Sequence, residues 1–560
     1  MKMIFNKERA RFELFSSYQD YKDGHLDLVK SARFRFEKEP VALWHTDDPE
    51  RASLLISCAD ESCKSILATR ARDRQESLIQ SRAFDADLGN KLDNLGLTAY
   101  PFQRAGIAYA MSRKDVLFGD EPGLGKTFQA LATIHLKHAY PCIAVVPATL
   151  KINWKKEAER YIPELREKGA VRIISGRHKP GQSLLEGRLD PGAMLQIINY
   201  DILESWVDEL SKQNPASIIY DESHFAKNKK AKRTQACLEL AKRGGQHYLL
   251  SGTALVNRPN ELQSQLEILG SIDKFGGSWG FLNRYCDPKT EYIWIRDPKT
   301  KKPVKRRVTT FDGATNTDEL QRKLREYVMV RRLKEDVLKE LPPKRHQVIE
   351  LACNGLQHYV DEENNLESQY NLEFSELETA REIASKSGNV KSFEEACLEI
   401  DRIFKAHFSE MSKLAHACAL AKVPKTLEYC LETLEGEKKL AVFAHHHDVE
   451  DALVAGFEAA GIKVVRLTGE ESPKQKDAAI ESFQKGDARV FLGGLKCSIG
   501  YTITAAHRAV FAELDWTPGV MDQAGDRLHR IGQLDSVLLT YIVLENSLDS
   551  KKVGMLIGKR

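Results

Sequence analysis

The chain has 560 residues, of which 42% are apolar and 29% are charged, and its formal net charge is +3. This length allows roughly three to five domains that each bury a core. No run of about 18 apolar residues could cross a bilayer and no charged-then-apolar leader opens the sequence, so we expect a protein that is neither secreted nor bound to a membrane. Because the charge is nearly balanced, any site for a polyanion must be local.

The first 72 residues consist of short mixed segments. The stretch "ARFRFEKEPVALWHTDDPERASLL" alternates Phe34 and Phe36, continues through a strand-like "VALWHT" and opens a helix at "DDPE" with an early proline. These features predict a small α/β or β-rich module over 1–72. The charged stretch over 73–97 predicts a solvated linker or a connecting helix.

From residue 98 to 338, short apolar runs alternate with amphipathic segments of helix length. The runs are "DVLFGD", "CIAVVPA", "MLQIINY", "SIIYDE" and "HYLLSGT". A second alternation, over 431–560, contains "KLAVFAHH", "KVVRLTG", "ARVFLGG", "RAVFAEL" and "VLLTYIV". Continuous apolar strands between helices are typical of parallel sheets, so the chain is predicted to be α/β with two parallel-sheet lobes.

The segment between the lobes, residues 339–430, shows no strand-like run. Its apolar side chains recur at helical spacing among charges, at Phe393, Ala396, Cys397, Ile400, Phe404, Phe408, Met411 and Leu414. We therefore predict a helical insertion.

Ten cysteines are scattered through the chain, mostly within apolar segments. This distribution predicts reduced core residues in a reducing compartment rather than a disulfide framework. Cys58 and Cys63, with His45 nearby, raise the alternative of a metal site, but structural zinc needs four ligands and no second pair is present.

The stretch "GDEPGLGKT" follows a strand-like run and precedes a helical one, which is the setting of a phosphate-binding loop. Gly123 and Gly125 let backbone N–H groups approach phosphate. Lys126 can reach the β- and γ-phosphates, and Thr127 can bind Mg²⁺. The loop departs from the usual form at Asp120, where a glycine is expected, and a purely structural glycine-rich turn is the alternative.

Two further strand ends in this lobe carry polar residues. In "SIIYDESH", Asp221 would hold Mg²⁺ and Glu222 would orient or deprotonate the attacking water. In "LLSGT", Ser251 and Thr253 lie beside the same sheet edge, where ligands of open α/β sheets collect. A surface acidic turn and an ordinary loop are the alternatives. The order of the motifs favours a catalytic pair and a coupling element that also includes Gly252.

The stretch "QAGDRLHRIGQ" in the second lobe places Arg527 and Arg530 three residues apart. The transition state of phosphoryl transfer spreads negative charge, and an arginine finger contributes on the order of 10³ to 10⁵ in rate. We predict that this pair completes the site of the first lobe. The alternative is a solvated pair bound to Asp526.

Two basic clusters are candidates for nucleic-acid contact, "KNKKAKR" at 227–233 and "PKTKKPVKRR", which includes Lys301 and Lys302. A solvated surface turn is the alternative for each. The second cluster lies in "KTEYIWIRDPKTKKPVKRRVTT", which predicts a hairpin with a basic turn, either a DNA wedge or a surface loop.

Over about residues 95–550, the chain resembles the Swi/Snf family of superfamily-two helicase-like ATPases. The resemblance rests on "AYPFQRAGI", "GDEPGLGKT", "VVPATLKINWKKE", "INYDIL", "YDESHFAKN", "LLSGTALVNRPNEL", "VMVRRLKEDVLKELPPK" and "QAGDRLHRIGQ". Within that family, "RYCD", "VFAHHHDV" and "VFAELDWTPGVMDQAGDRLHRIGQ" look most like the HARP-type annealing helicases, which rewind DNA and remodel stalled forks. The N-terminal "FRFEKEPVALWHTDDPERA" is similar to the small HARP module that recognises branched DNA.

The resemblance implies two RecA-like lobes that use ATP and Mg²⁺. It implies that Gln103 reads adenine and that motifs around Pro147 and Tyr200 grip the DNA backbone. The implied nucleotide site comprises Gln103, Asp120, Gly123, Leu124, Gly125, Lys126, Thr127 and Gln523, with Thr127 and Asp221 for the metal and Lys126, Asp221, Glu222, Arg527 and Arg530 for catalysis.

The function implied by the resemblance is ATP-driven translocation on duplex or branched DNA, with fork remodelling, branch migration or strand annealing as the outcome. Two alternatives stay open: a strand-separating helicase, and an ATP-dependent remodeller that displaces proteins such as RNA polymerase from DNA. Expected partners are DNA and a replication or recombination protein, without a membrane. The compact chain is typical of the cytoplasm of a bacterial or virus-infected cell, with the nucleus as the compartment if the source is eukaryotic.

The sequence departs from the family pattern at two places. "GGLKCSIGYTIT" stands where many members carry Gly-Gly-x-Gly-x-Asn-Leu, and Ala254 stands where a proline is common. The first departure leaves the DNA-contacting residues of that motif unassigned.

Overall fold

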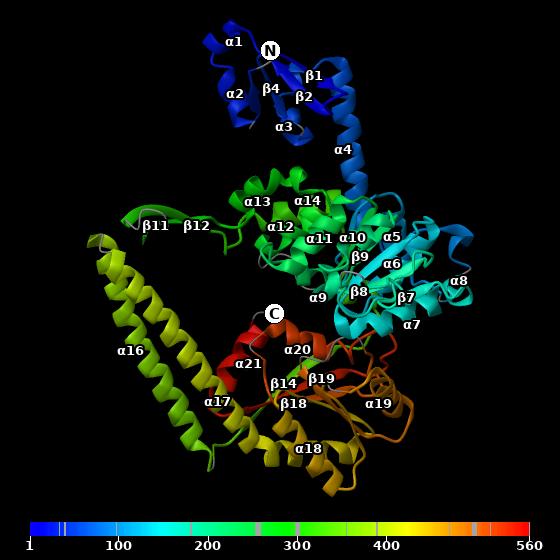
Figure 1. The fold of residues 1–560 in the computed structure, drawn as a ribbon, viewed down its shortest axis with the longest axis vertical. Helices are drawn as coiled ribbons and strands as arrows, with labels where there is room; N and C mark the ends of the chain where they lie inside the picture. Colours follow the sequence, from blue (N-terminus) through cyan, green and yellow to red (C-terminus); the bar gives the residue numbers. More distant parts are fainter. Residues whose placement is uncertain are drawn as a thin grey trace.

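The computed structural model describes residues 1–560 except 33, 39–40, 47, 94, 97, 180–181, 253–258, 297–302, 354, 388–389, 470, 496–500, 516 and 559–560. A small N-terminal module, a first α/β lobe and a second α/β lobe follow one another from top to bottom in Figure 1. The long helix α4 (Glu61–Arg82) leads from the module to the first lobe. The predicted class, α/β with two parallel-sheet lobes, is confirmed.

The N-terminal module is a four-stranded antiparallel sheet, ordered β1-β2-β4-β3, with short helices packed on it. Phe12, Leu14 and Val29 are fully buried in its core. The helix expected after "DDPE" is present, and the Asp48 side chain caps it by accepting from the Glu50 N–H. The elements are β1 (Lys2–Asn6), β2 (Arg11–Phe15), α1 (Tyr18–Lys22), α2 (Leu26–Ser31), β3 (Arg35–Glu37), β4 (Leu43–Thr46) and α3 (Pro49–Ser53).

The first lobe contains a seven-stranded parallel sheet, ordered β13-β5-β10-β9-β6-β8-β7. Alternate strand residues supply two cores, with Leu117 and Val145 in one and Phe118 and Val146 in the other, because the strands are buried on both faces. All five predicted runs are strands. The strands are β5 (Val116–Phe118), β6 (Cys142–Val146), β7 (Val171–Ile173), β8 (Leu195–Asn199), β9 (Ser217–Tyr220), β10 (Gln246–Leu250) and β13 (Met329–Val330).

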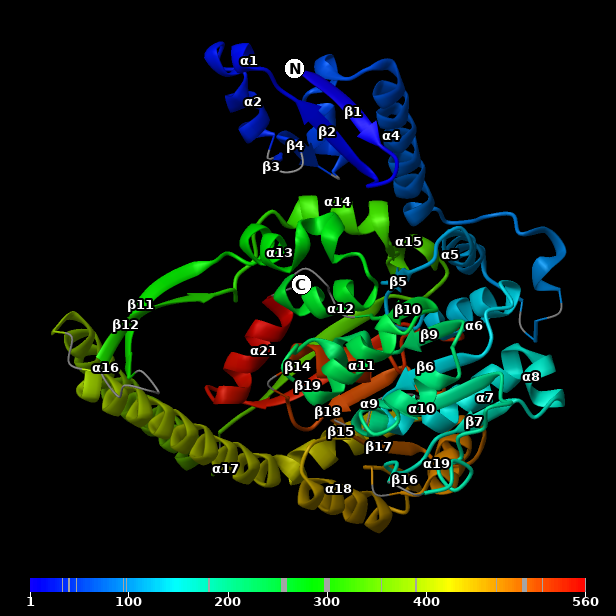
Figure 2. The same ribbon diagram turned by 45° about the horizontal axis from the view of Figure 1, so that its top comes forward.

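The helices of this lobe lie on both faces of its sheet (Figure 2). They are α5 (Pro101–Met111), α6 (Lys126–Leu136), α7 (Lys151–Tyr161), α8 (Pro163–Glu167), α9 (Tyr200–Leu203), α10 (Val207–Lys212), α11 (Lys232–Lys242), α12 (Leu262–Ile268), α13 (Gly277–Tyr285), α14 (Thr317–Tyr327) and α15 (Lys334–Val337).

The second lobe contains a six-stranded parallel sheet, ordered β14-β19-β18-β15-β17-β16. Its five predicted runs are β15 (Leu440–Ala444), β16 (Val464–Leu467), β17 (Val490–Gly494), β18 (Arg508–Phe511) and β19 (Val537–Leu544), and its helices are α18 (His447–Ala459), α19 (Pro473–Lys485), α20 (Pro518–Gly525) and α21 (Leu548–Gly558). The sixth strand, β14 (Lys344–Leu351), lies within the segment that we predicted to contain no strand, and that prediction is wrong. Because β14 is an edge strand with alternating exposure, it lacks a continuous apolar run.

Two long elements project from the lobes and meet at their far ends (Figures 1 and 2). The hairpin β11 (Lys289–Arg296) and β12 (Pro303–Thr310) extends from the first lobe, as predicted, although its basic turn with Lys301 and Lys302 lies outside the described residues. The helices α16 (Gln357–Ser387) and α17 (Val390–Gly436) extend from the second lobe, which confirms the helical character of the insertion. Strand β11 contacts α17. We propose that the second lobe is assembled from β14 and residues 438–558, with this helix pair inserted between them.

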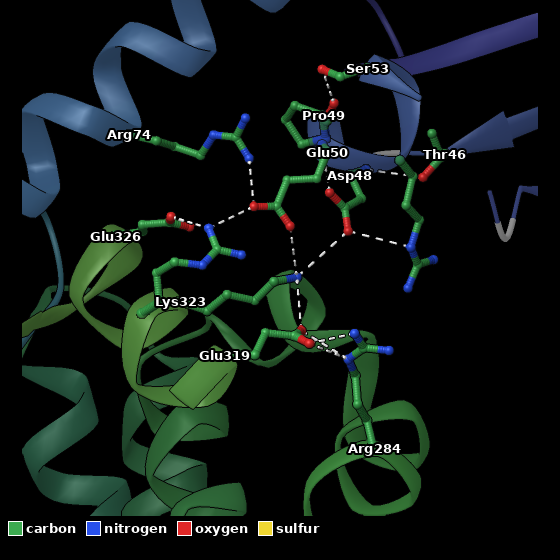
Figure 3. Close-up of polar contacts among 12 residues, drawn as sticks. Thr46, Asp48, Pro49, Glu50, Ser53, Arg74, Arg284, Glu319, Lys323 and Glu326 are labelled. Carbon is green, nitrogen blue, oxygen red and sulfur yellow. Dashed lines mark hydrogen bonds and ion pairs between the residues drawn. The ribbon is translucent and has the colours of Figure 1, made fainter. Parts of the chain in front are cut away.

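The N-terminal module is docked on the first lobe by ion pairs and by α4, which packs against α14 (Figure 3). The Glu50 carboxylate of the module accepts a hydrogen bond of 2.8 Å from Arg322 of α14. A cavity of about 970 Å³ lies between the module and the lobe. Residues 73–82 are therefore part of a connecting helix, one of the two predicted alternatives.

Among the residues that the structure describes, no helix is long and apolar enough to cross a membrane. In the same residues, no three metal-ligating side chains are grouped as a metal site. Burial raises the pKa of the Cys63 thiol to about 11, as expected of a reduced core residue.

Candidate nucleotide site between the two lobes

The phosphate-binding loop connects β5 to α6, as its sequence predicts. Gly123 and Gly125 adopt φ angles of +90° and +76°, a left-handed conformation that glycine tolerates. A Cβ at Gly125 would lie 2.4 Å from Nε2 of Gln103, so a larger residue would have to displace the Gln103 side chain. The loop therefore brings the backbone N–H groups at the start of α6 to a place open to an anion.

The ammonium group of Lys126 is held beside this loop by main-chain oxygens. Its Nζ donates to the carbonyl oxygens of Asp120 at 2.7 Å and Glu121 at 3.3 Å. Burial lowers the pKa of Lys126, and the Glu222 and Asp221 carboxylates oppose this shift only in part. A phosphate group at the loop would compensate a cation whose burial is unfavourable.

Asp221 and Glu222 follow β9 and lie near Lys126. Burial and the neighbouring Glu222 charge raise the pKa of Asp221 to about 7. Its Oδ2 accepts a hydrogen bond of 2.7 Å from Nε1 of Trp154, which orients the carboxylate. A divalent cation there would favour the ionised form of Asp221, as expected of a metal ligand.

Glu222 has a left-handed backbone, with φ of +46°. Although burial opposes ionisation, the contact with His224 and the cationic Lys126 and Arg527 lower the pKa of Glu222. Nδ1 of His224 lies 3.3 Å from the Glu222 carboxylate. Glu222 is therefore the ionised member of the pair, as a general base must be.

Arg530 of the second lobe lies against the phosphate-binding loop of the first lobe. A Cβ at Gly123 would lie only 3.0 Å from Cβ of Arg530 and 3.4 Å from Cε of Lys334. Burial and the nearby Arg527 lower the pKa of Arg530, whose Nη1 donates to the Tyr501 carbonyl at 3.3 Å. The buried Nε of Arg527 has no hydrogen-bond partner among the residues that the structure describes. Both guanidinium groups would be stabilised by an added anion.

Asp526 is not the partner of these arginines, so the alternative of a solvated pair bound to it is wrong. Its carboxylate is buried and lies 2.8 Å from Nζ of Lys334 and 3.1 Å from Nζ of Lys344. Those two ammonium groups lower its pKa although burial opposes the shift.

The residues present fit a bound nucleoside triphosphate with a divalent cation. The orphaned Arg527 Nε, the buried Lys126 ammonium and the glycine loop all favour added negative charge. Thr127 at the start of α6 and Asp221 after β9 supply the hydroxyl and carboxylate oxygens that Mg²⁺ prefers.

Two residues assigned to the nucleotide are held by other groups. The Asp120 carboxylate is fully buried and accepts from Nη2 of Arg332 at 2.6 Å and from Nε2 of Gln129 at 3.0 Å. Its side chain is therefore engaged by Arg332 and Gln129, and the place of Asp120 in the nucleotide site stays a prediction. Nε2 of Gln103 donates to the carbonyl of Leu124 at 3.2 Å, so this side chain contacts the loop. Gln523 lies half-buried in α20.

The coupling residues lie directly behind the loop. The Ser251 N–H donates to the Phe118 carbonyl at 3.1 Å, and a Cβ at Gly252 would lie 2.7 Å from Pro122 and 3.1 Å from Nζ of Lys126. Thr253 lies outside the described residues.

The two DNA-contacting residues expected in this lobe are buried. Tyr200 is 1% exposed, and its hydroxyl donates to the Asp221 carbonyl at 2.7 Å. Pro147 is buried at the end of β6, whereas Ala148 and Thr149 after it are exposed. Both side chains therefore face the protein, and DNA contact by the motifs around Pro147 and Tyr200 stays a prediction.

The basic cluster at 227–233 is partly paired with acidic side chains of the same lobe. Lys227 lies 2.9 Å from Glu261 and Lys229 lies 2.7 Å from Glu267. These pairs favour the alternative of a solvated surface turn.

Four residues of the site carried no assigned role in the sequence analysis, namely Trp154, Glu157, Arg332 and Lys334. Trp154 and Glu157 lie on α7 in the quoted "NWKKE", and Arg332 and Lys334 in the quoted "VRRLK". Burial raises the pKa of Glu157, which also interacts with Arg530 and Thr127. The signal that could have identified them is their residue type. Each is a tryptophan or a charged residue within a quoted motif, at a position where the helix or strand pattern alone does not require that type.

Removing the Arg332 guanidinium should destabilise the first lobe. Arg332→Ala leaves the fully buried Asp120 carboxylate without its cation, which costs about 3–5 kcal/mol of folding free energy. We expect a lower urea midpoint for the first lobe, followed by tryptophan fluorescence. Arg172→Ala, which breaks an exposed pair with Asp190, should change stability by less than about 1 kcal/mol. Equal midpoints for the two variants would contradict a structural role for the Asp120–Arg332 pair.

Two parallel-sheet lobes, with a phosphate-binding loop on one and a pair of arginines of the other against it, define a helicase-like nucleotide-binding protein. The chain belongs to the SNF2-related family: the SNF2-related domain model matches residues 102–406, and the Helicase conserved C-terminal domain model matches residues 422–532. The Swi/Snf resemblance is thereby confirmed.

Curated relatives match most of this chain. The SWI/SNF-related matrix-associated actin-dependent regulator of chromatin subfamily A-like protein 1 of Bos taurus is 32% identical over 555 residues, which cover 97% of this chain and 53% of that protein. The DNA annealing helicase and endonuclease ZRANB3 of Mus musculus is 32% identical over 473 residues, 83% of this chain and 40% of that protein. The chain thus spans about half or less of the length of these relatives.

A solved structure of the Sulfolobus solfataricus SWI2/SNF2 ATPase core in complex with dsDNA aligns with 83% of this chain and 92% of that chain, at 20% identity and a TM-score of 0.38.

Proposed function

We propose that the protein is a DNA-stimulated ATPase that translocates on duplex or branched DNA, remodelling forks, migrating branches or annealing strands. The observation that carries the proposal is the contact of Arg530 with Gly123, because it brings cations of one lobe to the phosphate-binding loop of the other. Hydrolysis that depends on this contact can be controlled by anything that moves the lobes, and DNA lying across both lobes would do so.

The chain's own residues divide the chemistry. The glycine loop and Lys126 bind the phosphates, Asp221 and Thr127 hold the metal, and Glu222 accepts a proton from the attacking water. Arg527 and Arg530 stabilise the charge that develops on the transferred phosphoryl group. Mg²⁺, which Asp221 and Thr127 would hold, would neutralise part of the charge on the phosphates.

DNA as the substrate is supported by the family and by the name of one relative, a DNA annealing helicase. Because the match to the bovine relative covers 97% of this chain, the N-terminal module is part of that similarity as well. We propose that this module recognises branched DNA. The hairpin β11–β12, with exposed Arg307, is a second candidate for DNA contact.

A replication or recombination protein is the partner that we propose beside DNA. The proposed place of action is the compartment that holds the cell's DNA, which is the cytoplasm for a bacterial or viral source and the nucleus for a eukaryotic one.

The proposal is tested by ATP turnover without DNA and with single-stranded, duplex and forked DNA. We expect forked and duplex DNA to raise kcat for ATP, and the forked substrate to act at the lowest concentration. Turnover that is the same with and without every DNA would overturn the proposal. Deleting residues 1–60 and comparing forked with duplex affinity separates branch recognition by the module from a remodeller whose module binds a protein.

A further inference from the structure

The segment from Glu326 to Lys334 is held at its first half by the helix that carries the N-terminal module. Oγ of Ser77, on α4, donates to the Glu326 carbonyl at 2.6 Å, and Oγ of Ser81 donates to the Met329 carbonyl at 2.7 Å. Both serines are buried. The backbone at the end of α14 and in β13 is therefore fixed relative to α4.

The second half of the same segment reaches both sides of the nucleotide site. The Arg332 N–H donates to Oδ1 of Asp120 at 2.9 Å, and the Lys334 N–H donates to Oε2 of Glu121 at 2.7 Å, so the segment holds the phosphate-binding loop. Nζ of Lys334 then crosses to the second lobe, where it donates at 2.8 Å to both Oδ1 of Asp526 and the His529 carbonyl.

Lys334 thus binds the residues that flank the catalytic arginines. Asp526 directly precedes Arg527, and His529 directly precedes Arg530. The Lys334 side chain is 8% exposed and that of Asp526 is 9% exposed, so water screens their interaction little. A shift of the Lys334 ammonium would move the turn on which both arginines are carried.

The N-terminal module forms ion pairs with α14, the helix whose end begins this segment (Figure 3). Its Glu50 binds Arg322 and lies 3.2 Å from Nη1 of Arg74, while Lys323 lies 3.7 Å from both Glu50 and Asp48. Arg322 and Lys323 belong to α14, a few residues before Glu326. A movement of the module would therefore displace the start of the segment through these ion pairs, and its middle through the contacts of α4.

We propose that Lys334 is a positioning residue for Arg527 and Arg530, and that the segment 326–334 couples the N-terminal module to ATP hydrolysis. The proposal rests on the function proposed above. It adds a route by which ligand binding to the module could move the arginines. The route runs through the segment 326–334, which is bound to α4 at one end and to the second lobe at the other.

The role of Lys334 is tested with Lys334→Met and Lys334→Arg. We expect Lys334→Met to lower kcat for ATP by about 10- to 100-fold while KM changes by less than about threefold, because the loop still binds ATP and only the arginine turn loses its support. Lys344 still lies 3.1 Å from Asp526, so the carboxylate keeps one cation. Lys334→Arg should recover most of the loss, and a thermal melt with a fluorescent-ATP affinity confirms that each variant is folded. An unchanged kcat in folded Lys334→Met would overturn the positioning role, as would a rise in KM alone.

The coupling is tested by a double-mutant cycle of Glu50→Gln and Lys334→Met. Glu50→Gln leaves Arg322 with Glu326, and Lys323 with Asp48 and Glu319, so the module should stay folded. We expect this change to alter kcat about fivefold in the wild-type background and less than about 1.5-fold beside Lys334→Met, because the route is then already broken. Glu61→Gln, which breaks an exposed pair with Lys64 on α4, should have no effect in either background.

Two results would overturn the coupling: effects of the two changes that simply multiply, or no effect of Glu50→Gln in either background. The cycle is run both on basal and on DNA-stimulated turnover. Absence of DNA stimulation in the wild type would sink the proposed function, whereas the cycle on basal turnover still decides the coupling.

Discussion

Replacing Glu222 by Gln should lower kcat for ATP by about 10²- to 10⁴-fold while ATP still binds. The amide keeps the size of the side chain but cannot accept the proton of the attacking water. The structure favours this assignment over Asp221, because Lys126, Arg527 and His224 keep Glu222 ionised, whereas burial raises the pKa of its neighbour to about 7. Single-turnover hydrolysis and fluorescent-ATP affinity separate the chemical step from binding.

The matched control for this variant is Glu239→Gln on α11. Its carboxylate binds Lys242 and Arg243 at the surface, so its loss should leave both kcat and affinity unchanged. Near-normal hydrolysis in Glu222→Gln would remove Glu222 from the role of base. Loss of ATP binding with it would indicate a structural role instead.

Replacing Arg530 by Ala should lower kcat by about 10³-fold and change KM for ATP by less than about threefold. Arg530 belongs to the second lobe, and its Cα and Cβ approach the phosphate-binding loop at Gly123. It can therefore act on the transition state without being needed for ATP to bind the first lobe. Arg527→Ala should behave in the same way, since its buried Nε has no hydrogen-bond partner within the described part of the chain and can bind an added anion.

Arg530→Lys should recover little activity, because one ammonium group cannot replace the planar guanidinium fork. Arg508→Ala is the control within the same lobe. Its guanidinium pairs with Glu437 at 2.8 Å, and neither residue belongs to the proposed nucleotide site. A raised KM with unchanged kcat in Arg530→Ala would contradict transition-state stabilisation and indicate simple ground-state binding.

Five strands of each lobe could be predicted because each is an apolar run that ends at a polar or small residue, whereas the short strands β7 and β13 offer no such run. Lys126, Asp221 and Glu222 could be assigned to one site because each lies shortly after a predicted strand. The carboxyl ends of these parallel strands share one edge of the sheet. Strand β14 could not be predicted in this way, because an edge strand in contact with solvent alternates polar and apolar residues.

The partners of the site residues could not be predicted, since they depend on contacts between distant segments. Asp120 and Arg332 are 212 residues apart, and Lys334 and Asp526 are 192 residues apart. The orientation of Tyr200 could not be predicted either: its motif follows a strand end, but its ring is turned inward and stacks on Phe225. A motif places a residue near a site, while packing decides which way its side chain points.

The most direct test of the central claim is displacement of a third strand from a DNA triplex by the full chain. With ATP and Mg²⁺, we expect the third strand to be released from a duplex with a free loading region, because the protein moves along the duplex and pushes the strand off. Glu222→Gln and Arg530→Ala should leave it bound. Hydrolysis of ATP that is stimulated by this DNA while the triplex stays intact would contradict translocation.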